Sequence, residues 1–535
     1  MRLGSFFRSL LMLLLALPVL LVLAAWLQWD SASAQVWQAL SETVLPDYLW
    51  SSLVLCAWVS VGVVSMGSVS AAAVTLFEFR GRQTLTWALL LPLAMPAYVV
   101  AYAYTDFLQF SGPLQQSLRL SFGWQGALWP DVRSLGGAAL VLSLSLYPYV
   151  YLLTRTALAE RAPQLMEAAR LLGAGLPRRI AQVALPLARP AIAAGLALAL
   201  METLADFGVS SYFGVQTFSA GIYKAWLVMD NRWAAAQLAS VLLVLVAAVL
   251  WLEQRAQRRL RFASSRSASR SGESQPLRLH GWPAALALLL CMMPVLLGFV
   301  LPMLIMLHAL WHSSQSLALP WQAFFGWTWN SLRLGALTAV LAVTAALLLA
   351  HSVRVQPSAW RRWQVQLVGL GYAVPGVVIV VGLLWPVAWL QAQWPQSQVG
   401  YWLTATSLGL VWAYLVRFIA VALQSVQSGY SRIASSADET ARLLGCSGWA
   451  LFQRVHWPLL KPASAAALLL VWVDVMKELP ATLVLRPFNT DTLAVMAYQL
   501  ARDERLGEAA LPSLALVLVG LLPVLLLSRT LQKPA

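Results

Sequence analysis

The sequence is poor in charged residues, and this scarcity determines its class. Only 11% of its 535 residues are charged and 60% are hydrophobic, whereas about a quarter of the residues in a soluble domain are charged. The mean hydropathy is +0.71. Apolar stretches of about 20 residues, the length that crosses a bilayer as a helix, recur along the chain. Regular apolar–polar alternation, the pattern of a transmembrane β-barrel, is absent. The composition predicts an all-α polytopic membrane protein.

The sequence also lacks the residues of a catalytic or nucleotide-binding site. Its three cysteines, Cys56, Cys291 and Cys446, are scattered, which supports neither a disulfide framework nor a zinc site. No G-x-x-x-x-G-K-[ST] phosphate-binding loop occurs. The chain therefore supplies no ATPase of its own, and we predict no catalytic residue, no certain metal ligand and no cofactor bound by it.

Twelve apolar segments are long enough to span a membrane, six in each half of the chain. Because six is an even number, the two halves share one orientation, as parallel repeats do. The predicted fold is thus about twelve transmembrane helices arranged as two parallel six-helix repeats. The predicted spans lie near 9–28, 51–76, 85–105, 137–157, 191–213, 232–252, 283–310, 331–352, 364–390, 401–425, 463–485 and 510–530.

Positive charge is unevenly distributed between the loops. Arginine-rich segments such as 155–189, 255–278 and 432–461 fall on one side, and the opposite segments carry acids such as Asp30 and Asp106. The positive-inside rule places both termini and the arginine-rich loops on the cytoplasmic side of the membrane. The net charge of +15 is then an orientation signal, and it does not indicate nucleic acid as a partner. The first span resembles a signal peptide, but its length favours a retained anchor.

Short motifs recur at a constant distance in the two halves. "WSSLVL" at Trp50 matches "WNSLRL" at Trp329, and "AMPAYVV" at Ala94 matches "AVPGVVI" at Ala373, both 279 residues later. The stretch between the halves is rich in Ser and Arg and reads as a cytoplasmic linker. The predicted divisions are a first repeat over 1–253, the linker over 254–281 and a second repeat over 282–535.

The most extensive matched motif is polar. "EAARLLGAGLPRRIAQVALP" begins at Glu167, and "ETARLLGCSGWALFQRVHWP" begins at Glu439, 272 residues later. Local rules predict a short helix over 163–172 that Gly173 and Gly175 stop by adopting positive φ, followed by a second short helix that starts at Pro177.

Prolines close each copy of this motif. Pro186 and Pro190 are expected to break the chain before the next span begins, and Pro458 and Pro462 stand at the corresponding places of the second copy. The repeated plan is a helix–turn–helix elbow on the cytoplasmic side of each repeat.

The two elbows resemble the cytoplasmic signature of binding-protein-dependent ABC importer permeases. The second copy departs from it at Thr440 and Trp457. The resemblance implies that each elbow is a coupling helix, that Glu167 and Glu439 are docking acids, and that the partners are two copies of an ATPase subunit that bind ATP and Mg. It also implies a periplasmic substrate-binding protein. The residues that carry it are Glu167, Ala168, Ala169, Gly173, Val183, Leu185 and Pro186 in the first copy and Glu439, Ala441, Gly445, Val455 and Pro458 in the second.

Each elbow is followed by a span that carries two acids. Glu202 pairs with Asp474 and Asp206 with Glu478 at the same 272-residue distance. Carboxylates deep in a membrane are costly and often functional, and four-residue spacing places both acids of a span on one helical face. We expect a pathway for a cation that prefers oxygen ligands. The structural alternative is that Lys477 neutralises an acid or that some acids brace a gate.

Three tyrosines in "LYPYVYLL" are a weaker candidate for the pathway. Their phenols could supply oxygen ligands, although tyrosines at such depth more often pack or anchor at an interface. They are Tyr147, Tyr149 and Tyr151.

Two blocks narrow the resemblance further. "METLADFGVSSYFGVQTFSAGIYKAW" and "MKELPATLVLRPFNTDTLAV" are similar to the fused permeases of bacterial ferric-iron importers, over nearly the whole chain. Thiamine importers have permeases of similar form and are the nearest alternative. An ion-gradient-driven secondary transporter would explain the acids but not the paired elbows.

Overall fold

The computed structural model describes residues 2–24, 26, 31–258, 277–316, 320–446 and 448–532, and this part of the chain is almost entirely helical. The two strands in these ranges, β1 (Phe77–Glu78) and β2 (Leu277–Arg278), pair in parallel. Most of the predicted linker lies outside the described residues. The predicted all-α membrane fold is confirmed.

Ten described helices are long and apolar enough to cross a membrane. An eleventh candidate is a pair of helices, Arg82–Ala94 and Ala97–Phe122, bent by 89° at a short break, and the apolar helix Leu10–Ala24 is shorter. The ten are Leu45–Leu76, Leu135–Ala159, Leu176–Ala205, Trp233–Arg255, Trp282–Ser313, Trp321–Val355, Gly376–Gln393, Ser407–Ser431, Gly448–Lys477 and Leu506–Leu526.

The structure separates into two compact units, and each takes segments from both halves of the sequence. Unit 1 comprises Met1–Thr43, Gly221–Leu243 and Pro320–Met496. Its helices, some of which continue into the other unit's segments, are α1 (Arg2–Ala24), α2 (Ser31–Thr43), η4 (Lys224–Val228), α12 (Arg232–Arg258), α15 (Trp321–Val355), α16 (Ala359–Gly369), η7 (Leu370–Ala373), α17 (Gly376–Gln393), η8 (Tyr401–Ala405), α18 (Ser407–Ser431), α19 (Ser435–Leu443), α20 (Gly448–Leu451), η9 (Phe452–His456), α21 (Trp457–Lys477), α22 (Pro480–Leu485) and α23 (Leu493–Arg502).

Unit 2 comprises Val44–Ala220, Val244–Leu319 and Ala497–Ala535. In addition to β1 and β2, its helices are α3 (Leu45–Leu76), α4 (Arg82–Ala88), η2 (Leu91–Ala94), α5 (Ala97–Leu108), α6 (Pro113–Phe122), α7 (Leu135–Leu171), α8 (Leu176–Arg179), η3 (Ile180–Ala184), α9 (Leu185–Ala205), α10 (Gly208–Tyr212), α11 (Phe218–Tyr223), α13 (Trp282–Val295), η6 (Leu296–Val300), α14 (Leu301–Ser316) and α24 (Leu506–Gln532).

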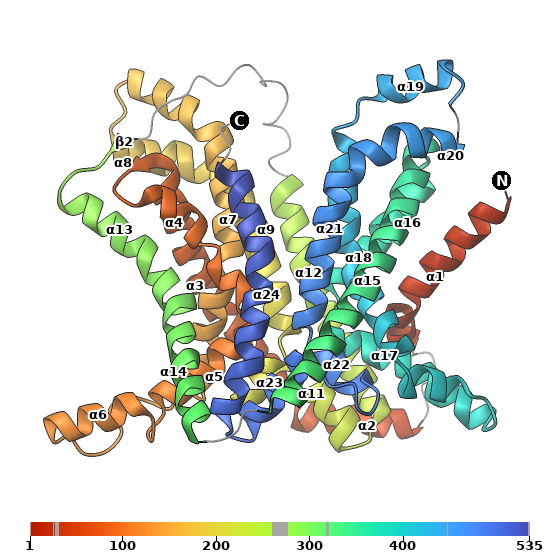
Figure 1. Cartoon of the computed structure of the whole chain (residues 1–535), viewed down its shortest axis with the longest axis horizontal. Helices are drawn as coiled ribbons and strands as arrows, with labels where there is room; N and C mark the ends of the chain where they lie inside the picture. Colours follow the sequence, from red (N-terminus) through yellow and green to blue (C-terminus); the bar gives the residue numbers. More distant parts are fainter. Residues whose placement is uncertain are drawn as a thin grey trace. The chain divides into compact units, whose positions relative to one another are not determined.

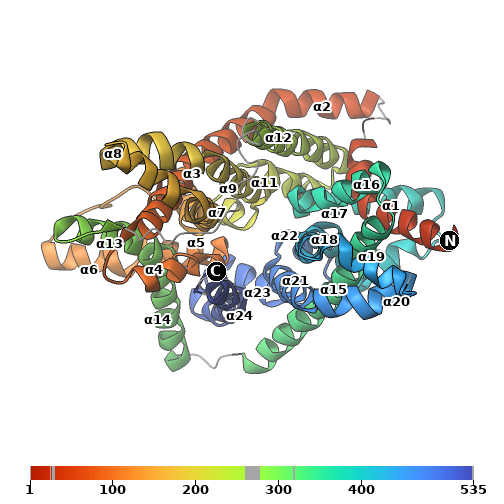
Figure 2. The same cartoon turned by 90° about the horizontal axis from the view of Figure 1, so that it is seen from above.

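The two units have the same core. In unit 2, α7 packs against α3 and α9, and in unit 1, α18 packs in the same way against α15 and α21 (Figures 1 and 2). The opening helix of each repeat packs outside its own repeat's core: α1 packs on α17 in unit 1, and α14 packs on α24 and α5 in unit 2. A side chain at Gly382 of α17 would overlap the backbone of Pro18 in α1. The small residue Gly382 thus allows α1, a helix of the first repeat, to approach α17 of the second repeat closely.

Two prolines begin new helices at matched places. Pro96 precedes α5 and Pro375 precedes α17, each after a 3₁₀ turn, η2 or η7, that ends two residues earlier. Because proline disfavours helical dihedrals in the residue before it, the chain changes direction there. The predicted spans near 85–105 and 364–390 are therefore interrupted helices.

The prolines after the elbows do not break the chain, contrary to the prediction. Pro186 lies in the first turn of α9, and Pro190 lies inside that helix. A π-helical turn, η3, precedes them, and the Leu185 N–H donates to the Ile180 carbonyl five residues back. The wider turn leaves room for proline rings, which lack an N–H donor. In the second repeat η9 and α21 repeat this arrangement.

Serines of the repeated Trp motif fix a loop to the core in each unit. The backbone N–H of Phe218, the first residue of α11, donates to Ser52 Oγ at 3.3 Å. The N–H of Leu493, the first residue of α23, donates to Ser331 Oγ at 2.9 Å. Each serine therefore satisfies a helix-terminal donor inside an apolar bundle.

We expect Gly67→Val and Gly195→Val to destabilise unit 2, because a side chain at either glycine would overlap the backbone of α7 at 2.9 Å or less. Overpacking of this kind costs about 1–3 kcal/mol, and the midpoint of thermal unfolding in detergent would fall. Gly326→Val in α15 is the control for the effect of valine in a helix, because an added Cβ at Gly326 would have no neighbouring atom within 4 Å. Equal losses in all three variants would contradict the packing argument.

Candidate functional site

The first elbow, residues 167–186, turns at Gly173 as predicted, but Gly175, for which positive φ was also predicted, has a φ of −65°. Gly173 has a φ of 82°, and its N–H donates to the Arg170 carbonyl, while the Ala174 N–H donates to the Ala169 carbonyl. This is the Schellman arrangement, in which a left-handed residue lets the chain satisfy the last helical carbonyls.

The second elbow, residues 439–458, has the same turn. Gly445 also has a φ of 82°, and the matched N–H groups of Gly445 and Cys446 donate to the carbonyls of Arg442 and Ala441. The two turns correspond residue for residue, so both repeats have the same turn geometry.

Each elbow exposes an acid and a pair of leucines. Glu167 and Glu439 are exposed, and so are Ala168 and Thr440 beside them. The leucines that end the helices are exposed by 84% and 88% in the first elbow and by 89% and 78% in the second. Each tip thus presents two large, exposed apolar side chains beside an exposed acid. The four are Leu171, Leu172, Leu443 and Leu444.

The first elbow stands on an apolar base in unit 2. Met166 is buried with Leu158, Ala184, Ala188 and Leu76. Leu158 and Met166 are eight residues apart and so lie on one face of α7. The structure has one continuous helix through 163–172, and not the separate short helix that was predicted. Burial of this face favours the unbroken helix.

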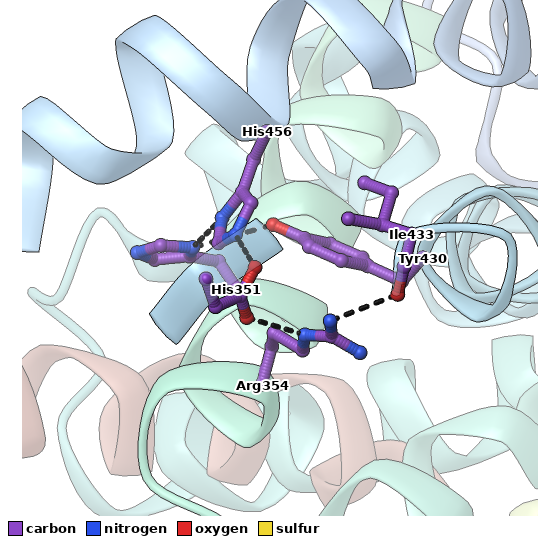
Figure 3. Close-up of polar contacts among 6 residues, drawn as sticks. His351, Arg354, Tyr430, Ile433 and His456 are labelled. Atoms are coloured by element: carbon purple, nitrogen blue, oxygen red, sulfur yellow. Dashed lines mark hydrogen bonds and ion pairs between the residues drawn. The ribbon is translucent and has the colours of Figure 1, made fainter. Parts of the chain in front are cut away.

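The second elbow stands on a polar base in unit 1 (Figure 3). Here α18 ends at Ser431 and a separate helix, α19, begins at Ser435, as predicted. Asp438 of α19 is only 6% exposed. Its Oδ2 accepts a hydrogen bond from Arg354 Nε at 2.7 Å, and its Oδ1 lies 3.0 Å from His456 Nε2.

The polar base continues through two histidines. His456 Nδ1 lies 3.3 Å from His351 Nδ1, which lies 3.2 Å from the Tyr430 hydroxyl. Arg354 also donates to the Ile433 carbonyl at 2.9 Å, in the gap before α19. Burial would raise the pKa of the Asp438 carboxyl, but hydrogen bonds from Arg354 and His456 outweigh it and hold that pKa below its usual range.

Sequence reasoning missed this polar base. A comparison of the repeats at the 272-residue spacing would have found it, because Asp438 stands where the first repeat has Met166 and His456 stands where it has Ala184. A buried acid in place of a core methionine requires partners.

The acids of the spans occupy two different environments. Glu202 and Asp474 lie within α9 and α21 and are partly buried. Asp206 and Glu478 are the residues at which those helices end, with extended backbone. The second acid of each span therefore follows about one helical turn after the first but stands at the helix end, so the helix that was predicted to carry both acids stops there.

Asp206 and Glu478 receive the first N–H groups of the next short helix. Asp206 accepts from the Ser210 N–H and hydroxyl, both at 3.0 Å, and from the Val209 N–H at 3.4 Å. Glu478 accepts from the N–H groups of Ala481 and Thr482 at 2.9 and 3.0 Å. Both acids therefore have a capping role at a break in a span.

Glu478 has a further partner that was not predicted. Arg417 Nη1 of α18 lies 3.5 Å from Glu478 Oε1, and the glutamate side chain is only 1% exposed. Neutralisation of Asp474 or Glu478 by Lys477 was the structural alternative, and for Glu478 the ion pair is with Arg417 instead. At the position that matches Arg417 the first repeat has Ser145, so the two breaks carry different charge.

The tyrosines of the first repeat pack inside unit 2. Tyr147 and Tyr151 are fully buried, and the Tyr151 hydroxyl donates to the Thr86 carbonyl at 2.7 Å. Tyr151 thus joins α7 to α4. In the described ranges no group of three or more His, Cys, Asp or Glu residues could hold a metal ion.

Comparisons with known proteins identify the same two regions. A family model described as a binding-protein-dependent transport system inner membrane component matches residues 64–262 and 342–533. Each matched range contains one elbow and one span break. The family thus occurs twice in this chain.

Curated relatives resemble the chain over most of its length. The Fe(3+)-transport system permease protein FbpB 2 of Haemophilus influenzae is 24% identical over 91% of this chain and 90% of that protein. The ferric transport system permease protein FbpB of Actinobacillus pleuropneumoniae is 24% identical over 88% of this chain and 69% of that protein. The putative 2-aminoethylphosphonate transport system permease protein PhnV of Salmonella typhimurium is 28% identical over only 39% of this chain and 76% of that protein.

We expect Arg417→Ala to destabilise unit 1 by about 3 kcal/mol, because removing one partner leaves a buried carboxylate without its counterion. Thermal unfolding in detergent measures the loss. The double variant Arg417→Ala/Glu478→Gln should recover part of it, since no uncompensated charge remains. Simple addition of the two single effects would show that the pair does not interact.

Proposed function

The chain belongs to the family of binding-protein-dependent transport system inner membrane components, and from this premise we propose that it carries ferric iron from a periplasmic binding protein to the cytoplasm. It is a multi-pass permease of an ABC-type importer of the inner membrane. The proposal adds the substrate, the coupling contacts and the orientation, with both termini in the cytoplasm.

The choice of ferric iron rests on how much of the chain its relatives cover. Relatives whose names specify Fe(3+) or ferric transport align with 86 to 91% of this chain. Those named for 2-aminoethylphosphonate align with 39 to 42%. A phosphonate or thiamine importer is the alternative, and both solutes differ from iron in charge or size.

The matched elbows support two docking contacts, one for each of two ATPase subunits. Each contact would have an exposed carboxylate, Glu167 or Glu439, to meet a basic residue, and two exposed leucines to fill an apolar groove. The partner subunits would bind ATP and Mg, because this sequence has no phosphate-binding loop of its own.

The elbows are also well placed to move the spans. The helical run from Leu176 to Ala205 connects the first elbow to the break at Asp206, and the run from Gly448 to Lys477 connects the second elbow to the break at Glu478. A displacement of either elbow would be carried along one rigid helix. Glu202 and Asp474, which lie on these helices, are the candidates for contact with the cation, while Asp206 and Glu478 hold the breaks.

We expect replacement of all four exposed leucines, Leu171, Leu172, Leu443 and Leu444, by serine to lower substrate-stimulated ATP hydrolysis of the assembled complex at least about tenfold. The loss of apolar contact at the centre of an interface has this effect on affinity. Glu167→Ala/Glu439→Ala should act in the same direction. ATPase activity in nanodiscs, together with co-purification of the ATPase, measures both.

Leu120→Ser is the matched control, because Leu120 in α6 is 87% exposed but belongs to no elbow. It should leave hydrolysis and co-purification unchanged. Full activity in the four-leucine variant would overturn the proposal that the elbows dock on the ATPase.

We expect vesicles that contain the complete importer to accumulate ferric iron, loaded on the binding protein, at least about tenfold faster than in the absence of ATP. Competition with excess thiamine or 2-aminoethylphosphonate should have no effect. Uptake of either of these solutes in place of iron would overturn the substrate assignment. Glu202→Gln/Asp474→Asn should slow iron uptake while the complex remains assembled.

A further inference from the structure

The polar base of the second elbow contains a contact between two histidines that depends on their protonation. Two imidazole nitrogens, His456 Nδ1 and His351 Nδ1, face each other at 3.3 Å. Only one hydrogen can lie between them in a hydrogen bond. The charge of the pair is therefore linked to whether the contact exists.

The neutral arrangement follows from the carboxylate. Asp438 can only accept, so His456 Nε2 carries the hydrogen that it donates to Oδ1. In a neutral imidazole the other nitrogen, Nδ1, then has a free electron pair. His351 Nδ1 must donate to it, and the Tyr430 hydroxyl lies beside the same hydrogen.

One added proton is tolerated by this geometry, but a second is not. With one, His456 becomes a cation that donates from both nitrogens, to Asp438 and to His351. With two, N–H groups on both rings point at each other at 3.3 Å and repel. The carboxylate of the cluster, Asp438, is already paired with the positive charge of Arg354, so it does not offset a second added proton.

Among the described residues, the surrounding elements provide no second carboxylate inside the cluster. Besides His456, the polar and charged side chains of the cluster come from α15 (His351 and Arg354), from α18 (Tyr430) and from α19 (Asp438). The remaining charged residues nearby lie at the surface or bond elsewhere: Arg432, Glu439, Arg442, Arg454 and Lys461 are exposed, and Arg361 of α16 donates to the carbonyls of Ser352 and Gln356.

The first elbow has no such group at any matched position. Thr75 occupies the position that matches Arg354. Apolar residues occupy the other four positions: Ala72 matches His351, Leu158 matches Tyr430, Met166 matches Asp438 and Ala184 matches His456. Leu158, Met166 and Ala184 are buried together, with Ala72 packed against them. Apolar packing of this kind is insensitive to protons between neutral and mildly acidic pH.

We propose that Asp438, His456, His351, Tyr430 and Arg354 form a proton-sensitive brace that positions helix α19, so that acidification releases the second elbow while the first stays in place. The five are positioning residues, since they hold α19 from beneath and the exposed tip makes the contact. That the release also uncouples one of two ATPase contacts rests on the proposed function. The brace itself does not.

The chain provides a native reporter for this test. Cys446 follows the turn of the second elbow, and Ala174 is its counterpart in the first. A spin label is attached to Cys446 in full-length chain with Cys56→Ser and Cys291→Ala, in nanodiscs without the ATPase. The control carries Cys446→Ala and Ala174→Cys and is labelled at the first elbow.

We expect the mobile fraction of the Cys446 label to rise about threefold between about pH 7.5 and about pH 4, and the label at position 174 to stay unchanged. The Asp438 carboxylate, whose pKa lies below its usual range, stays ionised through most of this interval. The change therefore reports the histidines. His351→Ala should abolish the rise on acidification, because no opposing N–H remains.

Asp438→Asn should instead mobilise the Cys446 label already at neutral pH, since Arg354 loses its counterion. A response that is equal at both elbows, absent at Cys446, or retained in His351→Ala overturns the brace. Because no ATPase is present, these outcomes are independent of whether the elbows dock on one. Loss of ATPase binding in the leucine variants bears only on the docking proposal.

Discussion

A carboxylate at each span break receives backbone N–H groups that the break has left without helical partners. Inside a hydrocarbon layer water cannot satisfy those groups, and each unsatisfied one costs several kcal/mol. Asp206 and Glu478 solve this problem in the two repeats with the same local geometry. The breaks, the short helices α10 and α22 that follow them and the change of chain direction there all depend on these two side chains.

The rigid helical runs that end at these breaks begin at the elbows. Proline within a helix would normally bend it, but the π-turns η3 and η9 absorb Pro186 and Pro458 without interrupting the run. Elbow and break are thereby joined in one element, which is the mechanical requirement for any coupling between a surface contact and the interior of the bundle. The same element occurs in both units, so the requirement is met twice.

The two repeats keep this geometry while changing its chemistry. Met166 and Asp438 occupy matched positions beneath matched tips, one in an apolar cluster and one between Arg354 and His456. The breaks differ as well, since Arg417 accompanies Glu478 and Ser145 stands at the corresponding position. The two repeats of a fused chain can diverge in this way because a substitution in one repeat leaves the other unchanged. In a homodimer, every substitution would occur in both subunits.

The sequence by itself determined the membrane class, the two repeats, the elbows with their turning glycines, and the family. These properties depend on composition and local spacing: apolar run length, a glycine that must adopt positive φ, and motifs that recur at a fixed distance. Only the tertiary structure decided that Asp206 and Glu478 are caps, that α1 leaves its own repeat to pack on α17, and that Asp438 is buried on two histidines. The last two facts join residues 18 and 364 positions apart, Asp438 with His456 and Pro18 with Gly382, and local pattern has no information about which distant side chains a packed bundle brings together.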